Sequence, residues 1–148
     1  MPPRMEQRVS RAARRGDLAT QFLSAIDLNG PLEAALLLKR SGTPLAAWSR
    51  RGAPTDVATV MAATLEGSLE TLVEAFGGPS TRAAFIKTGG WSIYVTKAEP
   101  QTLLLLAGPS VLPESFLQDE AERLLRRVSL PRTPAASRET GPGTGPRA

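Results

Sequence analysis

The stretch QTLLLLA, residues 101–107, is apolar at every position from Leu103 to Ala107. The stretch LEAALLLK, residues 32–39, is nearly as apolar and is bounded by turn residues. A strand that is apolar on both faces lies in the middle of a sheet, covered above and below. The two stretches therefore predict inner strands, although the high helix propensity of residues 32–39 leaves a short helix as the alternative there.

Three further strands are predicted at residues 44–49, 82–87 and 91–98, where short apolar or alternating runs lie between turn residues. The connections within the two groups of strands are tight turns, which makes the pairing antiparallel. Helices are predicted at residues 4–28, 56–76 and 113–128, because apolar side chains recur there every three or four positions. The expected fold is an α/β domain of order α-β-β-α-β-β-β-α, with three α/β/α layers on one five-stranded antiparallel sheet.

The helix predicted at residues 56–76, with Asp56 as its N-cap, carries a wide apolar arc. Its large apolar residues are predicted to face the sheet: Val57, Met61, Leu65, Leu72 and Phe76. A shoulder lies beside them: Ala58, Ala62, Leu69 and Val73. The arc is wider than one sheet contact requires, which indicates a second contact surface, but the shoulder is equally consistent with the margin of the core.

Three carboxylates, Glu66, Glu70 and Glu74, lie opposite this arc at steps of four residues. A metal or acid–base site is one interpretation of such a row. A solvated helix face is the prediction, because nothing in the sequence indicates a pocket there.

The net charge of +4 is placed at the two ends of the chain. Residues 1–17 form a basic arm with five arginines that continues into the first helix, and residues 129–148 are rich in Pro and Gly and predicted to be disordered. The folded domain predicted between them, residues 18–128, is slightly acidic, which argues against a nucleic-acid partner. The arm is predicted to be solvated, with an anionic surface as the alternative partner.

The chain has neither cysteine nor histidine. Thiol nucleophiles, histidine-based triads and disulfides are therefore excluded, and no cofactor or phosphate-loop motif is present. No apolar run approaches the roughly 18 residues that cross a bilayer. These features predict a cytoplasmic protein without enzymatic activity, metal, cofactor or transmembrane segment.

With this element order, residues 10–128 resemble the roadblock/dynein light chain family, which is related in fold to longin and profilin-like domains. The resemblance rests on the two strands around the turn at residues 40–43, on the helix DVATVMAATLEGSLETLVEAF at 56–76, and on the Leu-Leu-Leu-Leu-Ala-Gly strand before the last helix. The turn reads Arg-Ser-Gly-Thr, where many members carry an Asp-Gly type turn.

The resemblance implies an obligate dimer in which the central helix packs against its twin and the following edge strand pairs across the interface. The implied interface residues are Ala58, Ala62, Leu69 and Val73 on the helix, with Arg82, Ala84 and Ile86 on the strand. Bacterial and archaeal members of the family resemble regulators or scaffolds of small Ras-like GTPases.

The sequence is therefore interpreted as a non-enzymatic homodimeric adaptor that binds and regulates or scaffolds a small Ras-like GTPase. The alternative is a structural subunit of a trafficking or motor-type complex. A candidate partner surface is Trp48, Arg50 and Arg51. Core packing is nevertheless the favoured interpretation of Trp48, and Trp91 is likewise predicted to be buried in its strand. If an arginine finger exists, Arg50, Arg51 and Arg82 are its candidates.

Overall fold

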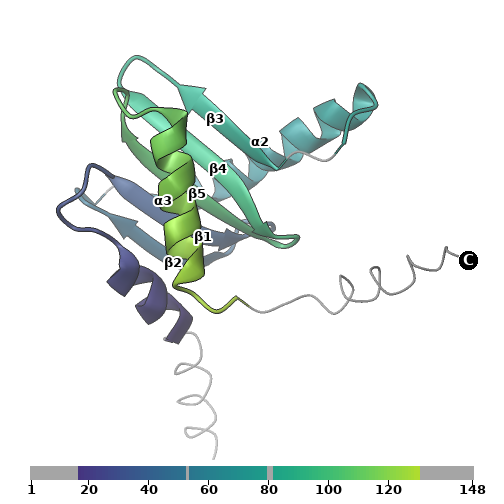
Figure 1. Ribbon diagram of the computed structural model, residues 1–148. Helices are drawn as coiled ribbons and strands as arrows, with labels where there is room; N and C mark the ends of the chain where they lie inside the picture. The colour runs from purple at the N-terminus through teal and green to yellow at the C-terminus, as the bar shows by residue number, and fades with distance from the viewer. Residues whose placement is uncertain (1–16, 53, 80–81, 131–148) are drawn as a thin grey trace, which may run out of the picture.

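The computed structural model describes residues 17–52, 54–79 and 82–130 (Figure 1). Its first described element is a helix over residues 17–25; residues 4–16 of the helix predicted there lie outside the described part. The other elements are β1 (Ala34–Lys39), β2 (Pro44–Ser49), α2 (Thr55–Ala75), β3 (Ala83–Lys87), β4 (Trp91–Glu99), β5 (Thr102–Pro109) and α3 (Glu114–Arg126). The predicted order of elements is confirmed.

The five strands form one antiparallel sheet in the order β2-β1-β5-β4-β3. The two stretches predicted as inner strands, β1 and β5, lie side by side, with Leu36 opposite Leu105 and Leu38 opposite Leu103. The alternative of a short helix at residues 32–39 is therefore wrong. The edges of the sheet are β2 and β3.

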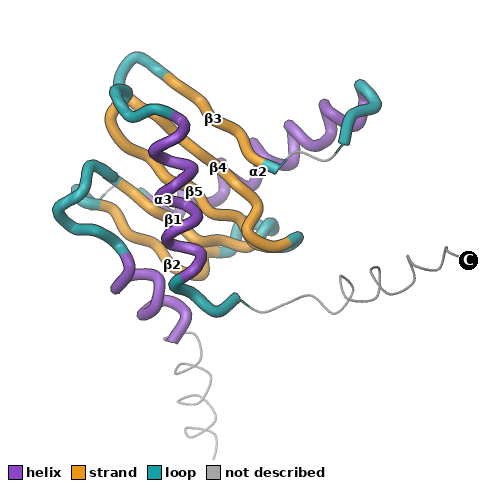
Figure 2. The backbone as a smooth tube through the Cα atoms, viewed as in Figure 1, coloured by secondary structure: helices purple, strands orange, loops and turns teal. Residues whose placement is uncertain are grey.

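Helices cover both faces of the sheet, as Figures 1 and 2 show. On one face, Leu37 and Leu104 pack in a core with the first helix and with Leu117 of α3. On the other face, alternate residues of the same strands, such as Leu36 and Leu105, pack in a second core with α2. Because successive side chains of a strand point to opposite faces, strands that are apolar at every position supply both cores. The predicted three-layer architecture is confirmed.

The first helix and α3 share one core. Phe22 and Ile26 of the N-terminal segment are buried in the same cluster as Leu124 and Val128. The backbone N–H of Ser129 also donates a hydrogen bond of 2.9 Å to Oε1 of Gln21. These contacts fasten the N-terminal helix to the end of α3.

The N-terminal end of α2 has no side-chain cap, whereas its C-terminal end has a glycine cap. Pro54 occupies the N-cap position without a side-chain cap, so the prediction of Asp56 as N-cap is wrong; Asp56 lies in the first turn, where its charge favours the helix dipole. At the C-terminal end, Gly77 has φ +76°, and the N–H of Gly78 donates to the carbonyl of Val73 at 3.0 Å. This is a Schellman cap, which requires the left-handed conformation that glycine adopts readily.

The side of α2 that packs on the sheet is not the predicted one. The buried residues of α2 are Thr59, Ala62 and Glu66, whereas most of the large apolar residues predicted to face the sheet are exposed: Val57, Met61, Leu72 and Phe76. Small side chains let the helix approach the sheet closely. The apolar arc is therefore divided, and its larger residues lie on the solvent side.

Candidate interaction site

The solvent side of α2 carries an unusual number of large apolar side chains. We call this surface the outer α2 face; its exposed apolar residues are Val57, Val60, Met61, Leu72 and Phe76. Phe76 is 81% exposed. Single exposed apolar residues are common, but several on one side of one helix indicate an interaction site.

A groove of about 550 Å³ follows the same side of α2. Most of the side chains that line it are small: Ala63, Thr64, Gly67, Ser68, Thr71, Leu72 and Ala75. The hydroxyls of Thr64 and Thr71 donate to backbone carbonyls one turn earlier, at 2.9 and 3.0 Å, so these polar groups have partners within the helix itself. Small side chains allow a second helix to pack closely against this one.

The C-terminal end of α2 extends beyond the sheet edge formed by β3 (Figure 1). After Glu70, the residues of α2 are exposed or half-buried. Leu72 and Phe76 therefore lie on a helix end that little of its own domain covers. We call this segment, residues 71–76, the overhang of α2.

The β3 edge is open to pairing, whereas the β2 edge is not regular. β3 reads Ala-Ala-Phe-Ile-Lys without proline, and only its β4 side is paired. β2 begins at Pro44, and its register with β1 shifts between Leu37 and Leu38. Proline and irregular register block strand addition, so β3 is the edge suited to pair with another strand.

The structure separates the predicted interface residues into two groups. Ala58 is half-buried and Ala62 is 3% exposed, and both contact the core beneath α2, so their position agrees with the margin-of-core interpretation. The others lie in or next to the overhang, or on or next to β3, and are exposed or half-buried: Leu69, Val73, Arg82, Ala84 and Ile86. Ala62 is therefore closed to another molecule, whereas the exposed or half-buried residues of the second group leave side-chain surface for one.

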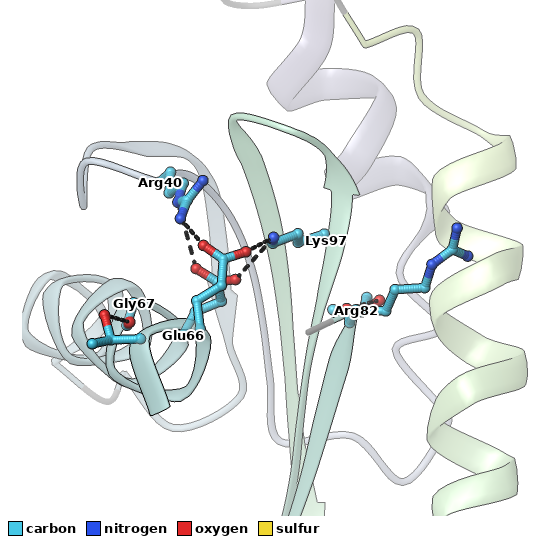
Figure 3. A network of polar contacts seen from close by, with 8 residues as sticks. Arg40, Glu66, Gly67, Arg82 and Lys97 are labelled. Carbon is cyan, nitrogen blue, oxygen red and sulfur yellow. Dashed lines mark hydrogen bonds and ion pairs between the residues drawn. The ribbon is translucent and has the colours of Figure 1, made fainter. Parts of the chain in front are cut away.

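A charge network of four side chains, of which Glu66 is buried and the other three are partly exposed, holds the middle of α2 to the sheet (Figure 3). We call it the buried charge network after its central residue, Glu66. Glu66 lies 3.6 Å from Nε of Arg40 and 3.4 Å from Nζ of Lys97, and Glu70 forms ion pairs with the same two cations. Arg40 follows β1 and Lys97 belongs to β4. The network therefore joins three elements with balanced charge.

This arrangement corrects the prediction that the glutamate row is a solvated face. Glu66 is 4% exposed and Glu70 is half-buried, while Glu74 alone is exposed as predicted. Sequence spacing places Glu66 and Glu70 on one side of the helix but does not show which side faces the sheet. The two cations that pair with Glu70 lie 30 and 27 residues away in sequence, so no local pattern reveals the network.

Arg50, predicted as part of a partner surface, is a clamp within the domain. Its guanidinium donates to the carbonyls of Leu28, Gly30 and Leu32 at 2.8–3.2 Å. It also lies 5.3 Å above the ring of Trp48, which packs against the core. The core interpretation of Trp48 is therefore the one that its contacts support.

We expect Arg50→Ala to destabilise the domain by about 1–3 kcal/mol, because it removes charged hydrogen bonds from carbonyls that are partly buried. Arg51→Ala is the matched control, since the Arg51 side chain is 83% exposed. Thermal unfolding followed by circular dichroism measures the difference. Equal midpoints for the two variants would show that Arg50 is not a clamp.

Arg51 and Trp91 meet at the end of the sheet opposite the charge network. Trp91, predicted to be buried, is 45% exposed. It lines a cavity of about 220 Å³ with Arg51, Glu33, Gly90 and Pro109. Sequence reasoning treated Trp91 as a packed strand residue and missed this cavity, because only the register of β4 against β5 places Trp91 opposite Pro109.

The perturbed ionisable groups have structural causes. Burial raises the pKa of the Tyr94 phenol, and the hydrogen bond to Glu120 raises the pKa of Arg123. Both shifts keep these groups in their usual protonation state at neutral pH. In the described ranges, no group of three or more metal-binding side chains occurs, and no helix is long and apolar enough to cross a membrane.

Comparison with known proteins identifies the fold. The family described as Roadblock/LC7 domain matches residues 19–107, more than half of the chain. A comparison with curated proteins found no match.

Several solved structures share the fold at low sequence identity. A Roadblock/LC7 domain from Streptomyces avermitilis has a TM-score of 0.65 and 18% identity, covering 74% of this chain and 92% of that one. The gliding protein mglB of Thermus thermophilus has a TM-score of 0.65 and 19% identity, covering 76% and 88%. Profilin IA of Acanthamoeba castellanii has a TM-score of 0.50 and 16% identity, covering 73% and 93%, which agrees with the expected relation to profilin-like folds.

Proposed function

Because the chain belongs to the Roadblock/LC7 family, we propose that it is a non-enzymatic, dimeric adaptor that binds a small Ras-like GTPase and regulates or scaffolds it. The observation that carries the proposal is the outer α2 face, whose large apolar side chains lie on a helix that already packs on its own sheet. A helix with two apolar sides requires two partners, and the sheet is only one of them.

A second copy of the chain is the partner that fits this face. Pairing two β3 edges around a two-fold axis would place the overhang of each α2 above the partner's sheet. The face that receives it is incompletely covered near Ile86 and Ile93, which lie opposite each other and are half-buried. Of the interface residues implied by the family resemblance, the proposed interface includes Leu69, Val73, Arg82, Ala84 and Ile86. It leaves out Ala58 and Ala62, which pack in the core, and adds Met61, Leu72 and Phe76.

The GTPase would bind at a surface outside this contact. Arg51 and Trp91, which line one cavity, are the best candidates, because tryptophan and arginine are enriched among the residues that dominate protein interfaces. Of the two arginines of the predicted partner surface, Arg51 also has the more exposed side chain, although its Nε lies 3.4 Å from Oε1 of Glu33. The adaptor would act by positioning surfaces on the GTPase in the cytoplasm, without a catalytic base of its own.

The folded unit of this adaptor is proposed to span residues 18–128. The family match ends at residue 107, but α3 belongs to the same core, where Leu117, Ala121 and Leu124 are buried. Removal of α3 would expose that core. The basic arm at residues 1–17 and the tail at 129–148 fall outside this unit.

Binding to purified small Ras-like GTPases from the same genome tests the function. Each GTPase is loaded with GDP or with a non-hydrolysable GTP analogue and titrated calorimetrically with the chain. We expect one nucleotide form to bind, and Arg51→Ala with Trp91→Ala to weaken that binding by about tenfold or more. Lys39→Ala, exposed at the opposite end of β1, is the control and should not change the affinity.

Absence of binding to any of these GTPases in either nucleotide form would overturn the GTPase partner. The structural subunit of a trafficking or motor-type complex would then be the better interpretation. Binding that Arg51→Ala with Trp91→Ala leaves unchanged would instead show that the GTPase uses another surface.

A further inference from the structure

The buried charge network is the last firm attachment of α2 to its own sheet. Up to Glu70, α2 packs on the sheet through the buried Thr59 and Ala62 and the partly buried Ala58, Ala63 and Leu65. Glu66 and Glu70 add the ion pairs with Arg40 and Lys97. Beyond Glu70 the overhang begins, and its residues are exposed or half-buried. The network therefore lies immediately before the overhang along α2.

The network is a poor device for stability alone. The two carboxylate oxygens of Glu66 are buried and have no hydrogen-bond partner among the described residues, so their attraction to Arg40 and Lys97 is only ionic. Removing two opposite charges from water costs free energy that such pairs seldom recover, and apolar residues of similar size often stabilise a core equally well. The geometry that the network imposes on α2 therefore explains these four charged residues better than their contribution to stability does.

The positions of the four charges fix the rotation of α2 about its own axis and its distance from the sheet. Arg40 reaches Glu66 and Glu70 from the β1–β2 side, and Lys97 reaches the same carboxylates from β4. Glu66 and Glu70 lie one helical turn apart, with one cation on each side of them. All four charges are paired in only one orientation of α2 on the sheet. Arg82 points away from the charge network (Figure 3). Arg40 and Lys97 are therefore the two cations that pair with Glu66 and Glu70.

We propose that Arg40, Glu66, Glu70 and Lys97 are positioning residues that set the direction in which the overhang of α2 leaves the sheet, and thereby determine the geometry of dimerisation. This inference rests on the proposed dimer. The network makes no contact with the partner: it holds Leu72 and Phe76 where the second copy can receive them. Preorganisation of this kind raises affinity by reducing the ordering that association requires.

The test replaces one cation and one anion together, in Glu66→Met/Lys97→Met, which leaves the Arg40–Glu70 pair in place. The dimer dissociation constant is measured by sedimentation, and a spin label at Glu74→Cys reports the distance across the dimer. The label is unique because the chain has no other cysteine. We expect a folded protein whose dissociation constant rises by about tenfold and whose label distances spread over a broader range.

The conservative variant Lys97→Arg should keep the wild-type dissociation constant and the narrow distance distribution. Arg40→Gln/Glu70→Gln removes the other pair and should reproduce the defect, which covers the case in which the methionine variant does not fold. Unchanged affinity and distances in both double variants, with a dimeric wild type, would overturn the positioning role alone. A monomeric wild type would overturn the proposed dimer and this inference with it.

Discussion

Ala62→Glu is expected to unfold the domain rather than to separate two folded protomers. Ala62 is 3% exposed and packs in the core beneath α2 with Leu36 and Leu38. A carboxylate buried among these apolar side chains costs about 3–5 kcal/mol, a large part of the roughly 5–15 kcal/mol that stabilises a domain. Thermal unfolding should show a midpoint lower by about 10–20 °C, or no cooperative transition.

Met61→Glu is the matched control for this prediction. Met61 is the adjacent residue on α2 but is 58% exposed, on the outer α2 face. Although Met61 belongs to the proposed interface, the same charge there removes no packing within the chain, so it should lower the unfolding midpoint much less than Ala62→Glu does. An Ala62→Glu variant as stable as Met61→Glu would mean that α2 does not pack on the sheet through Ala62.

Lys97→Met is expected to destabilise the domain by about 3–5 kcal/mol, because it leaves the buried Glu66 and the half-buried Glu70 with Arg40 as their one cation. Adding Glu66→Met should restore most of that loss, since charge balance returns and the remaining pair is Arg40 with Glu70. Urea denaturation of wild type and of both variants measures the three free energies of unfolding.

A double variant no more stable than Lys97→Met would contradict this account of the network. It would show that Glu66 and Lys97 contribute independently. Lys39→Met, on the exposed end of β1 and outside the proposed interface, controls for the loss of a lysine and should stay within about 0.5 kcal/mol of wild type.

The strands were predictable from the sequence because their pattern has few alternatives. Residues 32–39 and 101–107 are apolar at nearly every position, and such strands need cover on both faces, which fixes the three layers. Glycine and proline at the turns then fix the antiparallel order. None of these inferences depends on knowing which residues far apart in sequence meet.

The orientation of α2 was not predictable for the opposite reason. Periodicity describes the faces of a helix, but the choice between them depends on the surface it meets. Here the sheet supplies Lys97 from β4 and Arg40 from the end of β1, so the glutamate side can be buried and the larger apolar side left outward. The wide apolar arc did indicate a second contact surface, but it did not identify the residues.

The role of Arg50 was hidden in the same way. Its partners are backbone carbonyls at residues 28–32, which no side-chain pattern records. Two adjacent arginines, Arg50 and Arg51, read alike in sequence, yet one is bound within the domain and the other is exposed. Only the folded chain distinguishes a clamp from a candidate contact residue.

Light scattering across a concentration series tests the dimer through the outer α2 face most directly. For the wild type we expect twice the 15.7 kDa mass of one chain, and for Leu72→Glu/Phe76→Glu the mass of a single folded chain. Val111→Glu/Ser24→Glu, which places the same charges on exposed residues outside α2, should remain dimeric. A wild type that stays at 15.7 kDa at the highest concentration would contradict the proposed dimer. A Leu72→Glu/Phe76→Glu variant that stays dimeric would contradict the role of the outer α2 face in forming it.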